Sequence, residues 1–144
     1  MNRFAPFFGL GIALFGGVAF ADPCTAIPDR GPMPAYLHRG AVFSGPVAYV
    51  GDGDGLCVAV GPTPDQWVEV RLADFYAPEL SEPGGKEAKR ALETLVMDKA
   101  VSCTAQKRSY DRVVAICRLN GQSLGDRLRR NGATEGGRGK TQRP

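Results

Sequence analysis

Short runs of β-branched and aromatic residues, separated by glycine and proline, occupy the middle of the chain. Such runs at 46–50, 56–60 and 67–73 predict three strands, and two more at 101–105 and 112–119 predict a hairpin. The sequence Gly-Asp-Gly-Asp-Gly between the first two runs predicts a turn. We therefore expect most of the regular structure to be β-strand.

Two segments show helical periodicity instead. Residues 86–99 are predicted to form the main helix, because apolar groups recur there at the spacing of one helical face. Residues 123–130 predict a second, short helix that begins with a capping-box-like pair, Ser123 and Asp126. The apolar stripe of the main helix comprises Ala88, Leu92, Leu95, Val96 and the aliphatic stem of Lys99.

This order of elements predicts the α+β class: a small five-stranded OB-type β-barrel with one main helix and a short C-terminal helix. The barrel domain is expected at 46–133. An irregular arm with four prolines, at 22–45, precedes it. Residues 134–144 are rich in glycine, arginine and lysine, and they predict a flexible basic tail.

Residues 1–21 have the pattern of a secretory signal peptide: Arg3, a mostly apolar stretch, and then Ala-Phe-Ala before a polar segment. Cleavage is expected after Ala21. An uncleaved membrane anchor is the alternative, but the apolar stretch is short for a bilayer span and rich in glycine. We expect a monomer that is secreted or periplasmic and that does not contact the membrane after cleavage.

Four cysteines remain after that cleavage, and an exported chain would meet an oxidising compartment. No Cys-x-x-Cys pair occurs and His38 is the only histidine, so a zinc site is not expected. Two disulfides allow three pairings. Cys103 and Cys117 flank the turn of the predicted hairpin, which favours their pairing and leaves Cys24 with Cys57.

The formal net charge of +3 hides an asymmetry. Residues 22–105 include seven basic and twelve acidic residues, whereas residues 106–144 include ten basic and three acidic residues. An acidic region beside a basic one suits a cation site next to a track for a polyanion. A solvated surface with a basic tail explains the same asymmetry equally well.

Side chains of the kind that cleave phosphodiesters follow one another along the predicted barrel: Asp52 and Asp54, Arg71, Glu79, and Arg112. Carboxylates can hold a hard cation and position water, and guanidinium groups can grip phosphate oxygens and neutralise developing charge. In order and spacing these residues resemble the staphylococcal-nuclease-like (thermonuclease) family.

The family pattern consists of Asp-Gly-Asp-Thr, Arg-Leu-x-x-x-Asp-x-Pro-Glu and Tyr-Gly-Arg. Here, residues 52–55 read Asp-Gly-Asp-Gly, residues 71–79 read Arg-Leu-Ala-Asp-Phe-Tyr-Ala-Pro-Glu, and residues 110–112 read Tyr-Asp-Arg. Each motif is weak alone, but their joint order makes a chance match improbable. The resemblance extends over residues 47–133 and implies a barrel with an active site on its rim.

The resemblance implies a calcium ligand at Asp54, supported by Asp52, with the main-chain carbonyl of Ala77 as a further ligand. Tyr76 stands where the family has a second metal carboxylate, and a neutral phenol is a poor ligand for a hard cation. Asp74 could replace that carboxylate, since alternation in an extended strand puts it on the same face, or it could be a solvated strand residue. We therefore expect Ca²⁺ or another divalent cation, weakly held.

For catalysis, the resemblance implies that Arg71 and Arg112 clamp the phosphate and that Glu79 positions or deprotonates the attacking water. These roles predict a secreted, divalent-metal-dependent phosphodiester hydrolase, a thermonuclease-like endonuclease acting on DNA or RNA. The alternative, favoured by Tyr76, is a catalytically impaired domain of the same fold that binds nucleic acid or another partner. A small disulfide-braced module that binds cell-envelope polymers would explain export but not these residues.

Overall fold

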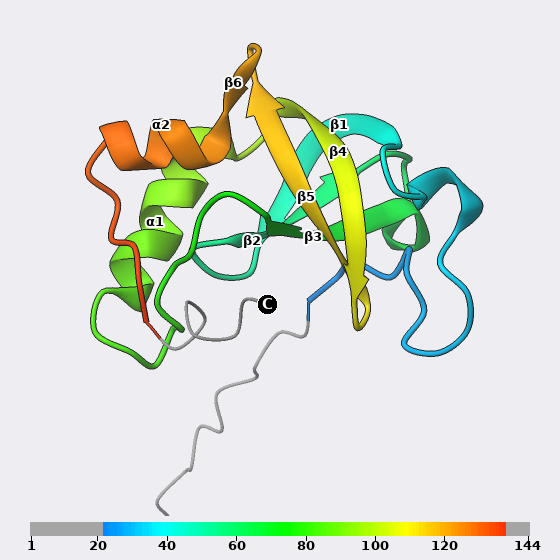
Figure 1. Cartoon of the computed structure of the whole chain (residues 1–144), viewed down its shortest axis with the longest axis horizontal. Helices are drawn as coiled ribbons and strands as arrows, with labels where there is room; N and C mark the ends of the chain where they lie inside the picture. Colours follow the sequence, from blue (N-terminus) through cyan, green and yellow to red (C-terminus); the bar gives the residue numbers. More distant parts are fainter. Residues whose placement is uncertain (1–21, 138–144) are drawn as a thin grey trace, which may run out of the picture.

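The computed structural model describes residues 22–137. Its strands are β1 (Val42–Val50), β2 (Gly55–Ala59), β3 (Trp67–Leu72), β4 (Ala100–Ser109), β5 (Arg112–Leu119) and β6 (Gln122–Ser123). The first five strands form a barrel (Figure 1), in which β1 lies antiparallel between β2 and β4. A parallel pairing of β3 with β5 closes the barrel, and the short β6 pairs with β5.

Two helices, α1 (Gly85–Val96) and α2 (Leu124–Arg130), lie together at one end of the barrel, on the left in Figure 1. Two single 3-10 turns, η1 (Ala35–Leu37) and η2 (Pro64–Gln66), complete the regular structure of the described residues. The α+β class and the five-stranded OB-type barrel that the sequence predicts are confirmed.

Alternation along the strands separates the barrel interior from its outer face. In β3, Val70 and Leu72 are buried in the core, whereas Glu69 and Arg71 between them are only partly covered. Successive residues of a strand point to opposite faces, so the polar residues of β3 share one outer surface. This surface leads to the rim where the predicted site residues lie.

The main helix ends earlier than the sequence predicts. α1 stops at Val96, Met97 forms the C-cap, and Asp98 adopts a left-handed conformation with φ of 60°. Lys99 therefore lies outside the helix and is exposed, and its ammonium donates to the carbonyl of Leu95 at 3.0 Å. Its stem does not complete the apolar stripe, although the other four predicted positions are buried.

Strand boundaries also differ from the prediction. β1 begins at Val42 instead of at residue 46, because residues 42–46 pair with β4. The hairpin of β4 and β5 is longer than predicted, and its turn is confined to Tyr110 and Asp111. The predicted helix cap is confirmed, since the hydroxyl of Ser123 accepts a hydrogen bond from the N–H of Asp126 at 3.2 Å.

Both predicted disulfides are present. Cys103 and Cys117 are directly paired across β4 and β5, with a Cα–Cα distance of 4.0 Å. Cys24 joins the N-terminal arm to Cys57 of β2, with a Cα–Cα distance of 5.8 Å. In the chain-entropy model each bond contributes about 3 to 4 kcal/mol by restricting the unfolded state. Such bonds are typical of proteins that fold in an oxidising compartment.

The last described residues are not a free tail. The N–H of Gly136 donates to the carbonyl of Tyr76 at 2.9 Å, and Glu135 accepts hydrogen bonds from Arg129. Residues 134–137 are thus packed against the domain, contrary to the predicted flexible tail. The predicted signal peptide at 1–21 and the tail beyond residue 137 lie outside the described residues. Between residues 22 and 137, no helix is long and apolar enough to cross a membrane.

Candidate active site on the barrel rim

Three parts of the chain meet at Gly53, in the turn between β1 and β2. A Cβ at this position would lie 2.4 Å from the Cβ of Ala77, in the segment after β3, and 2.6 Å from the Cβ of Ala88 in α1. No side chain fits so close an approach, so glycine is required here for packing. The turn and the segment of residues 74–79, which we call the rim segment, are thereby held in contact.

Asp54 is the buried carboxylate at this junction, with a relative exposure of 7%. Its Oδ2 accepts a hydrogen bond from the N–H of Ala77 at 3.0 Å, and its own N–H donates to Oδ1 of Asp52 at 3.1 Å. Burial, and next the charge of Asp52, raise the pKa of Asp54 to about 7, although the Ala77 N–H and the charge of Arg71 oppose this rise. Two carboxyl groups are therefore in close contact, with one guanidinium nearby.

Ala77 presents its main chain to Asp54. Pro78 restricts the residue before it to the β and polyproline II regions, so the main chain of Ala77 is extended where it meets Asp54. The carbonyl of Ala77 belongs to the same short stretch of main chain as the N–H that reaches the buried carboxylate. A carboxylate and a carbonyl in this arrangement are oxygen ligands of the kind that hard cations prefer.

Tyr76 supports an arginine. Arg71 lies opposite Gly55 of β2 and beside Val114 of β5, and its guanidinium carbon is 5.9 Å from the centroid of the Tyr76 ring. This distance permits a cation–π interaction. Tyr76 is itself buried, with a relative exposure of 8%. The ring of Tyr76 therefore helps to hold the guanidinium of Arg71.

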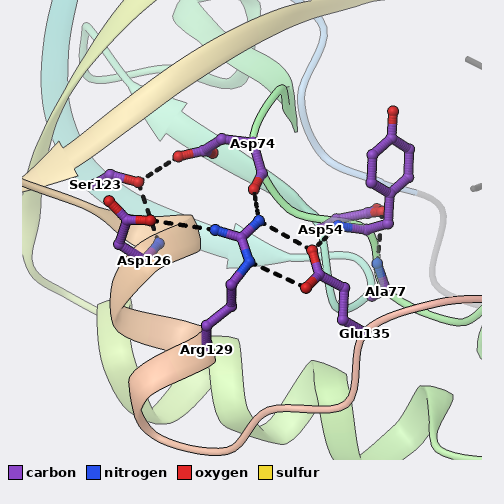
Figure 2. Close-up of polar contacts among 8 residues, drawn as sticks. Asp54, Asp74, Ala77, Ser123, Asp126, Arg129 and Glu135 are labelled. Atoms are coloured by element: carbon purple, nitrogen blue, oxygen red, sulfur yellow. Dashed lines mark hydrogen bonds and ion pairs between the residues drawn. The ribbon is translucent and has the colours of Figure 1, made fainter.

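Asp74 is directed toward α2, as Figure 2 shows. Its Oδ2 accepts a hydrogen bond from the hydroxyl of Ser123, and a Cβ on Gly125 would lie 2.9 Å from the same oxygen. Its Oδ1 is buried and has no hydrogen-bond partner among the described residues. These contacts do not support the expectation that Asp74 replaces the missing carboxylate at position 76.

The two remaining predicted residues come from the end of the rim segment and from the start of β5. Glu79 is exposed at the end of the rim segment, and its N–H donates to Oε2 of Glu82 at 2.9 Å. Arg112 begins β5 on the same outer face as Arg71, because the parallel register pairs Arg71 with Val114 and alternate residues share a face. Both guanidinium groups are thus carried by neighbouring strands.

An acidic group that the sequence does not predict lies beside Arg112. Glu69 lines a pocket of about 290 Å³ between the N-terminal arm and the barrel, together with Asp22 and Asp111. Burial, and next the charges of Asp22 and Asp111, raise the pKa of Glu69 to about 8, whereas the charge of Arg112 opposes the rise. The sequence holds no signal for this group, because the arm and β3 meet only in the folded chain.

We predict that Glu69→Gln changes the pH dependence of stability. The folded chain holds the proton of the Glu69 carboxyl group more tightly than an ordinary glutamate does. The pKa of Glu69 is about 8 in the folded chain, against an ordinary value of 4.5. Glu69 therefore contributes fully to the free energy of unfolding at a pH below its ordinary pKa. This contribution is lost as the pH rises through the pKa of Glu69 in the folded chain. The free energy of unfolding of the glutamine variant should rise relative to that of the native chain over this interval.

Denaturant titrations from about pH 5 to about pH 8 measure this difference. Asp65→Asn is the control, because Asp65 is an exposed acid in η2. If Glu69→Gln follows the pH profile of the native chain as closely as Asp65→Asn does, the raised pKa of Glu69 is refuted.

A second group of contacts, on the α2 side of the rim segment, was also missed. Arg129 of α2 lies among Asp126, Glu135 and the main chain of Asp74 (Figure 2). Three arginines occupy the last turn of α2. Their spacing does not distinguish the one that contacts the rim, so no sequence signal was available.

Comparison of the sequence with models of known protein families gives no match. Comparison with curated protein sequences gives no match either. Support for a function therefore comes from the fold and from the rim residues themselves.

Proposed function

We propose that this chain is a phosphodiester hydrolase that uses a divalent cation to cleave DNA or RNA. The observation that carries the proposal is the meeting of Asp54, the Ala77 main chain and Arg71 at one rim of the barrel. This grouping would provide a cation site and a phosphate site next to each other. A surface that only binds nucleic acid would need the basic groups but not the buried carboxylate.

The residues present fit a weakly held divalent cation. Asp54, Asp52 and the carbonyl of Ala77 would hold it, and all three offer the hard oxygen ligands that Ca²⁺ and Mg²⁺ prefer. Asp52 lies close enough to Asp54 to raise its pKa, after the larger effect of burial, so two carboxyl groups face the same place. Tyr76 supplies no charged oxygen, so water and substrate would have to complete the coordination. When bound, the cation would polarise the phosphate and neutralise part of its charge.

Three side chains would act on the substrate. Arg71 is already restrained by the ring of Tyr76, so it would grip phosphate oxygens with little further loss of side-chain freedom. Arg112 would neutralise the charge that develops on the phosphate during attack. Glu79 would orient the attacking water and accept its proton.

A second candidate function is nucleic-acid binding without catalysis. Tyr76 favours it, because a neutral phenol at position 76 supplies no charged oxygen to hold a cation. Such a domain would retain single-stranded DNA or RNA but cleave neither. The two candidates therefore differ in one measurable property, which is cation-dependent cleavage.

Export of the chain is part of the proposal. The pattern of residues 1–21 is typical of a cleaved signal peptide. The two disulfides are typical of proteins that fold outside the reducing cytosol. A secreted or periplasmic enzyme would meet nucleic acid at or beyond the cell envelope.

Tyr76→Asp tests the proposal where the candidates differ. An aspartate at position 76 should lower the cation concentration for half-maximal cleavage about tenfold, because it adds a charged oxygen ligand. Tyr76→Asn is the matched control, since it removes the same ring and has the size of aspartate without its charge. The measurement is a cation-titrated cleavage assay of the mature protein on single-stranded DNA and on RNA.

Two results would contradict either the proposed function or the place that it gives to position 76 beside the cation. A native chain that binds single-stranded nucleic acid but cleaves none at any cation concentration would establish the second candidate. Efficient native cleavage at low cation concentration that Tyr76→Asp leaves unchanged would show that position 76 does not face the cation.

A further inference from the structure

Arg129 of α2 is the centre of the contacts in Figure 2. Its Nε and Nη2 donate to the two carboxylate oxygens of Glu135, both at 3.0 Å, and its Nη1 donates to Oδ1 of Asp126 at 3.2 Å. Its Nη2 also donates to the main-chain carbonyl of Asp74, and its guanidinium carbon lies 5.7 Å from the centroid of the Phe75 ring. One side chain thus joins α2, residues 134–137, which we call the C-terminal segment, and the start of the rim segment.

Glu135 extends these contacts to the next residue of the rim segment. Its Oε1 accepts a hydrogen bond from the N–H of Tyr76 at 3.4 Å, and Gly136 donates its N–H to the carbonyl of Tyr76 at 2.9 Å. The C-terminal segment therefore contacts both main-chain groups of Tyr76, the N–H through the side chain of Glu135 and the carbonyl through the N–H of Gly136.

Tyr76 and Ala77 are held from opposite edges. In an extended chain the N–H groups of successive residues point to opposite edges. The N–H of Tyr76 points to Glu135, and the N–H of Ala77 points to Asp54. The rim segment is consequently fixed on one edge by the buried carboxylate and on the other by Glu135, which Arg129 holds in place. Loss of either contact would leave the main chain of Tyr76 and Ala77 less restrained.

From this arrangement we propose that Arg129 is a positioning residue for the cation site, a role that rests on the function proposed above. No carboxylate at position 76 ties the rim segment to a cation, so the place of the Ala77 carbonyl depends on contacts within the protein. Arg129 provides them through Asp74 and Glu135. Its loss should weaken cation capture and leave the chemical step unchanged.

Arg129→Gln in the mature chain tests this role, with Arg130→Gln as the matched control. Arg130 is the next residue of the same helix, and its guanidinium donates to Gln122 of β6 at 3.2 Å. In Arg129→Gln the cation concentration for half-maximal cleavage should rise about tenfold or more, as is usual when a group that orients a metal ligand is lost. The rate at saturating cation should stay within about twofold, and the control should change neither quantity.

Glu135→Gln provides an independent variant should Arg129→Gln fail to fold. It should raise the cation requirement in the same direction, and the double variant should add little, because the two residues act as one unit. An unchanged cation requirement in the folded variants would overturn the role. A fall in the saturated rate with no change in cation requirement would overturn it as well.

Hydrogen exchange separates this role from the proposed function. If the native chain does not cleave, the proposed function fails, but the amides of Tyr76 and Ala77 still report on the rim segment. Faster exchange at these two amides in Arg129→Gln, and not in Arg130→Gln, supports positioning. Equal exchange in both variants, or faster exchange throughout the chain, overturns it.

Discussion

Replacing Glu79 with glutamine is expected to lower the rate of cleavage by about two to four powers of ten, the range typical of a lost general base. The amide keeps the size of the carboxylate but cannot accept a proton from the attacking water. Glu79 is exposed, so the free energy of unfolding should change by no more than about 0.5 kcal/mol. Single-turnover cleavage at saturating divalent cation is the measurement.

Glu87→Gln is the matched control for this substitution. Glu87 is an exposed acid of α1 that pairs with Arg90 at 2.9 Å, and it has no proposed role in cleavage. The loss of rate should persist in the Tyr76→Asp background, because water activation and cation capture are separate contributions. A Glu79→Gln chain that cleaves at the native rate would assign water activation to another group.

Arg112→Ala is expected to reduce turnover by about two to three powers of ten, with a smaller change in affinity. A guanidinium that neutralises developing charge contributes more in the transition state than in the bound substrate. Arg118→Ala is the control, because Arg118 is exposed near the other end of the same strand. Separate values of kcat and KM on single-stranded DNA measure the effect. Lost affinity with native turnover would instead make Arg112 a contact to the nucleic-acid backbone.

Much of the fold could be predicted because its signals are local. Glycine and proline mark the ends of short β-branched runs, and helical spacing identified the buried positions Ala88 and Leu92. The pairing of Cys103 with Cys117 followed from their places in one hairpin. Each of these signals depends on residues that are neighbours along the chain.

The predictions from sequence were wrong where contacts between residues far apart in the chain override local signals. Val42 belongs to β1 because it pairs with Thr104 of β4, although its own neighbourhood resembles an arm. Residues 134–137 are rich in glycine, yet they are ordered by contacts of Glu135 and Gly136 with Tyr76. Composition alone cannot reveal a partner that lies so far away in sequence.

The candidate site was predictable only in its motif residues. The order of Asp54, Arg71 and Glu79 along the chain led to the rim, and the fold does bring Asp54 and the neighbouring Arg71 together there. The direction of Asp74 toward Ser123 was not predictable, because it depends on where α2 packs. The contact of Arg129 with the rim segment was not predictable for the same reason. Arg129 is also one of three arginines in the last turn of α2.

Taken alone, this sequence indicates the class of fold and the disulfide within the hairpin, since periodicity, turn chemistry and the spacing of Cys103 and Cys117 are properties of nearby residues. The second disulfide followed by elimination, and the rim side chains followed from the resemblance of the motifs. Only the folded chain decides that Asp54 is buried against the Ala77 main chain, that Tyr76 supports Arg71, and that Arg129 reaches the rim. Burial, pKa and hydrogen-bond partners are set by residues from separate elements, and those residues become neighbours only when the barrel closes and α2 packs against it.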